Sequence, residues 1–186
     1  MPFTETSLPG LYIFEPKVFP DGRGYFFESY SKRAFEAAGI EAEFVQDNQS
    51  SSCFGVIRGL HYQHEPHTQA KLIRVLQGKI LDVVVDLRAG SPGFGKSFSI
   101  ELSAENKKQL FIPKGFAHGF SVLSETADIA YKCDRFYNKE SEGGIRFNDP
   151  LLGIDWQIPA DRALISEKDA ALPAFNPEAA IFKFNS

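Results

Sequence analysis

Apolar and polar residues alternate along much of the chain, most clearly from residue 79 to residue 88, KILDVVVDLR. The apolar residues at positions 81, 83, 85 and 87 share one face of this segment, while Asp82 and Asp86 share the other. A period of two residues is typical of a β-strand, because successive side chains point to opposite faces. The segment therefore predicts a strand.

Further short segments of the same kind follow one another, with turn residues between them. The expected strands lie in LYIFEPKVF, RGYFFESY, AEFVQDNQSSS, GVIRGLHYQ, KLIRVLQG, KSFSIELS, KQLFIPKG, GFSVLSE and DIAYKCDRFY. The Asp21-Gly22 pair predicts a hairpin between the first two, and Gly78 predicts a tight turn. Many short strands with turns between them indicate a sandwich or a barrel, and a closed jelly roll leaves no exposed sheet edge. We therefore expect an all-β jelly-roll barrel, formed by residues 1–186 as a single domain.

Two segments predict short helices. In SKRAFEAAG, Ser31 is a candidate N-cap and Gly39 a candidate terminator. In SEKDAALPAF, Ser166 is a candidate cap for one or two helical turns.

Composition narrows the class of protein. The formal net charge of −4 and the 18 phenylalanines suit a globular β protein and argue against a binder of nucleic acid or of a membrane surface. Cys53 and Cys133 lie far apart in the sequence, which favours two reduced thiols. The chain starts without the basic and apolar regions of a signal peptide, and no segment is apolar enough to span a membrane. These features predict a soluble cytoplasmic protein.

The segment RGLHYQHEPH contains three of the chain's four histidines, His61, His64 and His67. No cysteine lies nearby, and Pro66 makes the second half a loop, which favours solvated roles for His64 and His67. His61 lies within a predicted strand. It is either a core histidine bonded to a carbonyl or a base that a carboxylate orients.

The segment IPKGFAHGF resembles the second motif of cupin-type barrels, in which the histidine, here His118, is often a metal ligand. Cupins of that kind also carry an upstream H-x-H, and this chain has none. The fold expectation is therefore a cupin-like jelly roll that holds no metal.

Several motifs together carry a narrower resemblance. In order along the chain these are DGRGYFFESY, FVQDNQS, VIRGLHYQ, QAKLIRVLQGKI, IPKGFAHGF, YKCDRFYNKESEGGIRFNDP, GIDW and SEKD. This ordered set resembles the dTDP-4-dehydrorhamnose 3,5-epimerase family. The resemblance implies a homodimeric isomerase that needs no cofactor. It would convert dTDP-4-dehydro-6-deoxy-D-glucose to dTDP-4-dehydro-L-rhamnose in dTDP-L-rhamnose biosynthesis.

The resemblance also implies roles for individual residues. His61 would be the proton acceptor, with Asp169 as its partner, and Tyr131 the proton donor. Lys71 would lie near the reacting carbonyl. The implied substrate-binding residues are Arg23, Phe26, Glu28, Gln46, Asn48, Arg58, Lys71, His118, Tyr137, Glu142 and Lys168. By analogy with the family, Arg23, Phe26 and Glu28 would serve the active site of the neighbouring subunit.

Strand geometry conflicts with one of these assignments. Regular alternation places Arg58 and His61 on opposite faces, although both are assigned to one cavity. A β-bulge at Gly59 would resolve the conflict.

The residues alone are compatible with three other functions. The chain could invert a single centre of another nucleotide ketosugar, could be a metal-dependent cupin using His61, His67 and His118, or could bind sugars without catalysis.

Overall fold

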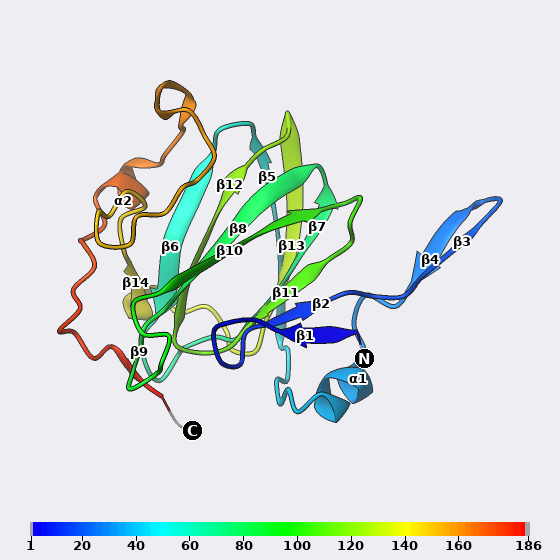
Figure 1. The fold of residues 1–186 in the computed structure, drawn as a ribbon, viewed down its shortest axis with the longest axis horizontal. Coiled ribbons are helices and arrows are strands. Elements are labelled where there is room, and N and C mark those ends of the chain that lie inside the picture. Colours follow the sequence, from blue (N-terminus) through cyan, green and yellow to red (C-terminus); the bar gives the residue numbers. More distant parts are fainter. Residues whose placement is uncertain (1, 185–186) are drawn as a thin grey trace.

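The computed structural model describes residues 2–184, which form two facing β-sheets (Figure 1). The larger sheet has six strands in the order β1 (Phe3–Glu5), β2 (Tyr12–Phe14), β11 (Gln109–Ile112), β7 (Lys71–Gln77), β13 (Thr126–Cys133) and β5 (Gln46–Cys53). The smaller sheet has five strands in the order β10 (Ser97–Ser103), β8 (Lys79–Asp86), β12 (Phe116–Val122), β6 (Ile57–Gln63) and β14 (Glu142–Gly144). Neighbouring strands within each sheet are antiparallel. The all-β jelly roll expected from the alternation is confirmed.

The remaining elements are short. They are the hairpin β3 (Val18–Asp21) and β4 (Gly24–Phe27), the parallel pair β9 (Arg88–Ala89) and β15 (Phe182–Lys183), the helices α1 (Lys32–Ala37) and α2 (Glu167–Ala170), and the 3-10 turns Lys139–Ser141 and Ala160–Arg162. Between residues 2 and 184, neither the length nor the apolar character of any helix suffices for a membrane crossing.

The main hydrophobic core lies between the two sheets. Ile73 and Ile129 contribute to it from the larger sheet, and Val84 and Phe120 from the smaller one, all of them buried. Burial of this apolar surface is the dominant force that holds the sheets together.

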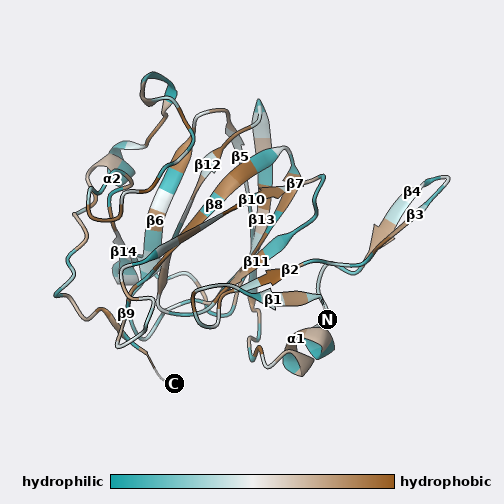
Figure 2. Ribbon diagram, viewed as in Figure 1, coloured by the Kyte–Doolittle hydropathy of each residue, from teal (hydrophilic) through white to brown (hydrophobic). Residues whose placement is uncertain are grey.

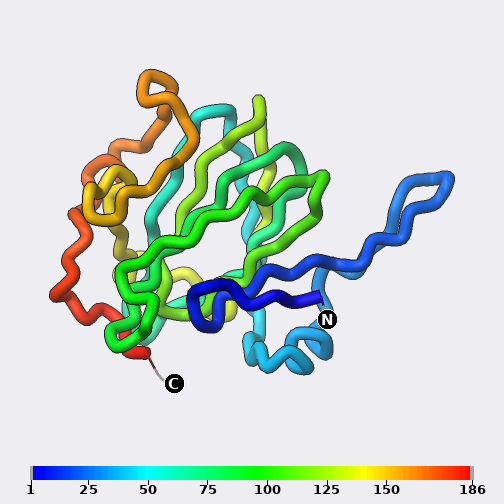
Figure 3. Tube along the Cα trace, viewed as in Figure 1, coloured from blue at the N-terminus to red at the C-terminus, as the bar shows by residue number. Residues whose placement is uncertain are grey.

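Strand β8 is buried on both faces, although its sequence alternates between apolar and acidic residues. Leu81 and Val83 point to the outer face, where they pack in a second cluster with Trp156 and Phe182. The segment that follows β14 supplies this cover as it runs along the smaller sheet, drawn in yellow to red in Figure 3. On the inner face Asp82 is fully buried among core residues. Figure 2 accordingly shows β8 as a mostly hydrophobic strand in the middle of its sheet.

Strand β6 contains the predicted bulge. Arg58 lies opposite Phe120 of β12, and His61 lies opposite His118, so three steps along β6 match two steps along β12. The extra residue lies at Gly59 or Leu60, and it brings Arg58 and His61 to the same face. Gly59 has φ of +111°, and a Cβ there would lie 2.6 Å from Gly119 Cα, so this position favours glycine.

The turn after β7 and the end of α1 lie where the sequence predicted them. Gly78 has φ of +74° between β7 and β8, and a Cβ on it would lie 2.0 Å from the Thr126 carbonyl oxygen. Gly39, with φ of +76°, follows α1 as expected. Ser31 occupies the N-cap position of α1 as predicted, although its side chain makes no capping hydrogen bond. Instead α1 is held by Phe35, which is buried in a third cluster against the outer face of the larger sheet.

The hairpin β3–β4 has a two-residue loop, Gly22 and Arg23, because Asp21 pairs with Gly24. The hairpin extends away from the barrel (Figure 1). Its aromatic residues Tyr25 and Phe26 are 59% and 69% exposed.

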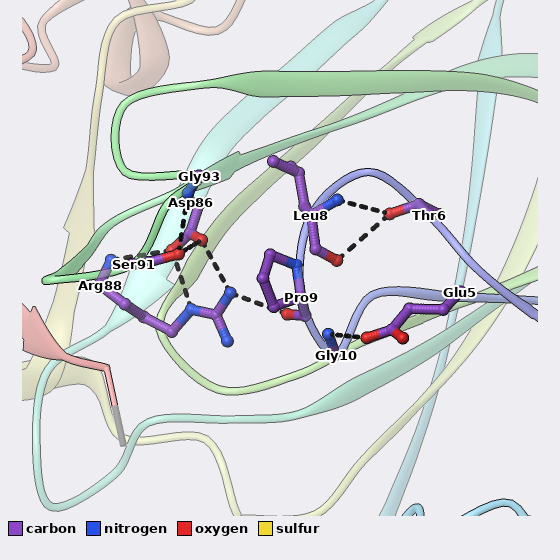
Figure 4. Close-up of polar contacts among 9 residues, drawn as sticks. All are labelled: Glu5, Thr6, Leu8, Pro9, Gly10, Asp86, Arg88, Ser91 and Gly93. Carbon is purple, nitrogen blue, oxygen red and sulfur yellow. Dashed lines mark hydrogen bonds and ion pairs between the residues drawn. The ribbon is translucent and has the colours of Figure 1, made fainter. Parts of the chain in front are cut away.

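A buried ion pair ties the N-terminal loop to the barrel (Figure 4). Arg88 Nη2 lies 2.7 Å from Asp86 Oδ2 and also donates to the Pro9 carbonyl oxygen at 2.9 Å. Ser91 Oγ donates to the same carboxylate at 2.6 Å. The guanidinium of Arg88 lies 4.9 Å from the ring centroid of Phe184, which joins the C-terminal segment to the same cluster.

Candidate active site

A cavity of about 520 Å³ opens between the sheets, at the end where β6 and β13 finish and β5 and β7 begin. Its lining residues are Gln46, Asn48, His61, Tyr62, Gln63, Gln69, Lys71, Tyr131, Cys133, Tyr137, Lys139, Glu142, Gly143, Lys168 and Leu172. The barrel interior is thus apolar over most of its length and polar at this end. A concave site with a few convergent polar groups is typical of small-molecule binding.

His61 and Asp169 form a hydrogen-bonded pair on the cavity wall. His61 Nε2 lies 2.7 Å from Asp169 Oδ1, while Asp169 Oδ2 accepts from the Gly59 N–H at 3.1 Å. Asp169 is buried at the start of α2, where its own N–H donates to the capping Ser166 Oγ at 3.1 Å, as the sequence predicted for Ser166. An ionised carboxylate can only accept, so Nε2 carries the proton and Nδ1 keeps its lone pair.

Burial lowers the pKa of His61 below its usual 6.5, and the charges of Lys71 and Lys168 act in the same direction. The hydrogen bond and the charge of Asp169 oppose this shift. His61 is therefore neutral at pH 7, the form that can accept a proton.

Lys71, Tyr131 and Cys133 reach the cavity from the larger sheet, opposite His61. Lys71 pairs in register with Cys133, and Tyr131 with Asn48. Burial lowers the pKa of Lys71 from 10.5, an effect that Cys133 and Asp82 oppose. Burial raises the pKa of Tyr131 above 10, so its phenol is protonated at neutral pH.

Arg58 lines a second cavity of about 500 Å³ that shares His61 and Lys168 with the first. The Nε and Nη2 atoms of Arg58 donate to Ser52 Oγ at 3.2 and 3.1 Å. The bulge in β6 thus brings Arg58 and His61 to one cavity, together with Asp169.

Further predicted binding residues surround the mouth of the main cavity. Lys168 Nζ lies 2.7 Å from Glu142 Oε2, and the bond from Lys168 lowers the pKa of the Glu142 carboxyl. Gln46 Nε2 donates to Asn48 Oδ1 at 2.9 Å.

His118, which the sequence assigns to substrate binding, is not among the lining residues of the main cavity. Its Nε2 is 2.9 Å from Asp82 Oδ2, and the carboxylate of Asp82 is fully buried. Strand alternation alone assigns Asp82 no functional role. An acidic residue on the inner face of an apolar strand needs a polar partner, and that rule could have identified it.

Arg23, Phe26 and Glu28 are not brought to the cavity of their own chain. They lie on or beside the hairpin that extends from the barrel (Figure 1), and none of them lines the cavity. Within residues 2–184, no three His, Cys, Asp or Glu side chains gather closely enough to hold a metal, and His61, His67 and His118 form no such group. His64 is exposed and His67 half-buried in the loop after β6.

The two facing sheets with a polar cavity at one end define a cupin-like jelly-roll protein. Residues 5–177 match the family model described as dTDP-4-dehydrorhamnose 3,5-epimerase. The chain belongs to this family and is an isomerase.

Known relatives agree with that assignment. The dTDP-4-dehydrorhamnose 3,5-epimerase of Shigella flexneri is 53% identical over 89% of this chain and 91% of its own. The crystal structure of the Elizabethkingia anophelis NUHP1 enzyme of the same name superimposes with a TM-score of 0.90, at 56% identity, over 93% of this chain and 95% of its own. The dTDP-6-deoxy-D-glucose-3,5-epimerase of Legionella pneumophila Philadelphia 1, in complex with dTDP-4-keto-L-rhamnose, gives a TM-score of 0.93 at 48% identity, over 99% and 98% of the two chains.

Proposed function

We propose that this chain inverts C3 and C5 of dTDP-4-dehydro-6-deoxy-D-glucose, giving dTDP-4-dehydro-L-rhamnose, with its own side chains and no cofactor. The observation that carries the proposal is the His61–Asp169 pair at 2.7 Å on one wall of a cavity whose other wall presents Lys71 and Tyr131. A base and a protonated acid on opposite walls are what inversion at a carbon requires.

The first step is removal of a proton from the carbon next to the ketone. His61 Nδ1 takes the proton, the C–H electron pair forms a C=C bond, and the C4 carbonyl oxygen becomes an enolate oxygen. The C4 ketone makes both C3 and C5 acidic, since either carbanion delocalises onto the same oxygen. Asp169 holds the imidazole in the productive tautomer and stabilises the imidazolium that forms.

A base alone does not suffice, because a ketone's α-carbon is a far weaker acid than an imidazolium. Lys71 is the group we assign to the enolate oxygen. A preorganised donor at a developing oxyanion contributes roughly 2.7–4 kcal/mol. General base catalysis contributes about 10²–10⁴-fold in rate, so the two effects act together.

The second step returns a proton to the opposite face of the same carbon. We assign this step to Tyr131, which approaches from the larger sheet, while His61 approaches from the smaller one. Burial keeps its phenol protonated until it is needed. The enolate collapses to the ketone. Before the next inversion the tyrosinate must regain a proton and the His61 imidazolium must lose one.

The rest of the site would hold the nucleotide. Arg58 and Lys168 are cations beside the His61–Asp169 pair, where they could bind the diphosphate of the nucleotide. Tyr137 would lie along the nucleotide or sugar. The polar groups of Gln46, Asn48 and Glu142 complete the assigned contacts, whereas His118, bonded to Asp82, is not part of the cavity lining.

We further propose a homodimer in which the β3–β4 hairpin reaches the active site of the partner copy. The exposed Tyr25 and Phe26 on a projecting hairpin support this, because a lone hairpin that exposes large aromatic rings is poorly stable by itself. Arg23 and Glu28 would then contact the substrate bound to the other subunit.

The reaction is tested by incubating the chain with the dTDP-ketosugar in D₂O and following C3 and C5 by NMR. We expect deuterium at both carbons, full activity in the presence of a chelator, and no exchange with His61→Ala. Exchange at one carbon only would indicate a single-centre epimerase, and binding without exchange would indicate a sugar-binding module. Loss of activity with chelator would indicate a metal enzyme.

The shared site is tested by mixing two inactive proteins, His61→Ala and Arg23→Ala/Phe26→Ala, after brief unfolding and refolding together. Shared sites predict that the mixture regains part of the activity, because a mixed dimer contains one intact site. A mixture as inactive as its components would contradict the proposal.

We also propose a cytoplasmic location. Both cysteines, the exposed Cys53 and the buried Cys133, are free thiols, as expected in a reducing compartment. Fractionation of cells that express the chain with a C-terminal tag tests this proposal.

A further inference from the structure

Both the nitrogen and the oxygen of the Gln63 side-chain amide form hydrogen bonds with two loops at the mouth of the cavity. It is the last residue of β6, two positions after His61, and is 6% exposed. Its Nε2 donates to the His67 carbonyl oxygen at 2.7 Å and to the Phe136 carbonyl oxygen at 3.4 Å. Its Oε1 accepts from the Asn138 N–H at 2.7 Å.

These partners determine which way the amide points. The two carbonyls can only accept and the backbone N–H can only donate, so a rotated amide would face like groups on both sides. Gln63 is therefore a specific clamp on the backbone at positions 136 and 138.

The residue between these two clamped positions is Tyr137, and a second glutamine holds it. The Tyr137 N–H donates to Gln46 Oε1 at 3.0 Å. Gln46 belongs to β5 of the larger sheet and Gln63 to β6 of the smaller one. Both sheets thus hold the backbone of three consecutive residues.

The ring of Tyr137 has little packing of its own. It is 54% exposed, and it makes no aromatic pair within the part of the chain described. Partial desolvation and the nearby carboxylate of Glu142, the partner of Lys168, raise the pKa of its phenol. Because little packing holds this ring, the position of its backbone mainly determines where the ring lies.

We propose that Gln63 is a positioning residue that holds Tyr137 at the cavity mouth, ready for the nucleotide of the substrate. This inference rests on the proposed function, which places Tyr137 against the nucleotide or sugar. A preorganised ring binds without the entropy cost of ordering a loop at the moment of binding. Gln63 therefore acts on affinity, and the proton transfers at His61 and Tyr131 do not depend on it.

The loop after β6 takes part in this clamp through its backbone and not through its histidine side chains. Gln63 contacts the backbone carbonyl of His67, and the backbone N–H of His64 donates to the Ser141 carbonyl oxygen at 2.7 Å. Neither contact involves an imidazole. His67→Ala should therefore leave the affinity for dTDP unchanged.

The test compares Gln63→Leu with Gln77→Leu, the same substitution at an exposed glutamine at the end of β7. We expect Gln63→Leu to raise both KM for the dTDP-ketosugar and Kd for dTDP, measured by calorimetry, about tenfold, with kcat unchanged. Gln77→Leu should change none of the three. Thermal unfolding of each variant reports whether it folds. If Gln63→Leu does not fold, it is replaced by Gln63→Asn, in which the amide is one methylene shorter.

A double-mutant cycle separates positioning from general damage to the fold. In a Tyr137→Ala background, the Gln63 substitution should weaken dTDP binding no further, because its effect passes through Tyr137. An equal loss in both backgrounds, a fall in kcat alone, or no loss in the parent background would overturn the inference. A parent chain that binds dTDP but does not epimerise would overturn the proposed function instead, and the dTDP affinities would still decide the role of Gln63.

Discussion

His61 Nε2 lies 2.7 Å from Asp169 Oδ1, although 108 residues separate the two in the sequence. The same carboxylate accepts the N–H of Gly59, one of the two residues of the β6 bulge. Asp169 therefore stabilises both the imidazole and the bulge that brings Arg58 to the same face. The helix that carries Asp169 is only four residues long, and its capping Ser166 accepts the backbone N–H of Asp169.

Asp169→Asn should lower kcat by roughly 10²–10⁴-fold, because an amide cannot stabilise the imidazolium and can bind the wrong tautomer of His61. Turnover of the dTDP-ketosugar measures the effect. Asp161→Asn, at an exposed position in the Ala160–Arg162 turn, is the matched control and should be fully active. An Asp169→Asn protein as fast as the parent chain would contradict the assigned role.

Tyr131→Phe should retain part of the exchange of substrate protons with D₂O while net inversion is lost. The reason is that His61 can still remove and return a proton on its own face, whereas the opposite face has no donor. NMR of C3 and C5 measures exchange and inversion in one sample. Tyr30→Phe, at a half-buried tyrosine that packs on α1, should behave as the parent chain. Equal loss of exchange and inversion would show that Tyr131 is not the donor.

The acid limb of the pH profile of kcat/KM should lie below pH 6.5. His61 must be neutral to act as base, and burial, together with Lys71 and Lys168, lowers its pKa from 6.5. Activity is therefore retained above the lowered pKa and falls as the pH drops through it. Lys168→Gln removes one of the positive charges, so the pKa of His61 should rise and the acid limb should move to higher pH. NMR titration of the His61 ring in the free protein checks this independently of substrate binding. A limb that stays in place or moves to lower pH would contradict it.

Arg88→Met should reduce the free energy of unfolding by about 3–5 kcal/mol, because it leaves the carboxylate of Asp86 buried without its charge partner. Asp86 is fully buried, and the guanidinium of Arg88 also contacts the N-terminal loop (Figure 4). Urea denaturation measures the change. Lys79→Met at the exposed pair with Glu101, 3.4 Å apart, should cost less than about 1 kcal/mol. Similar losses for the two substitutions would show that burial does not govern the Arg88 pair.

Much of the fold was predictable because strand periodicity and turn chemistry are local. The alternation around Asp82 predicted β8, and Gly78 predicted the turn before it. The bulge at Gly59 was predictable from a conflict between strand parity and assigned function. Ser31 takes its predicted N-cap position without a side-chain capping bond, and burial of Phe35 anchors α1.

The sequence by itself determined most of the strands, although not β1 or β14, together with the position of His61 within one strand and, through its ordered motifs, the family. Only the tertiary structure decided which distant groups meet. It pairs Asp82 with His118, covers the outer face of β8, sends the hairpin with Arg23 away from its own cavity, and makes Gln63 a clamp on both sides of Tyr137. The physical reason is that the two-residue repeat of a strand determines to which face of the sheet a side chain points. Sheet register and the path of the rest of the chain determine which residues pack against that face.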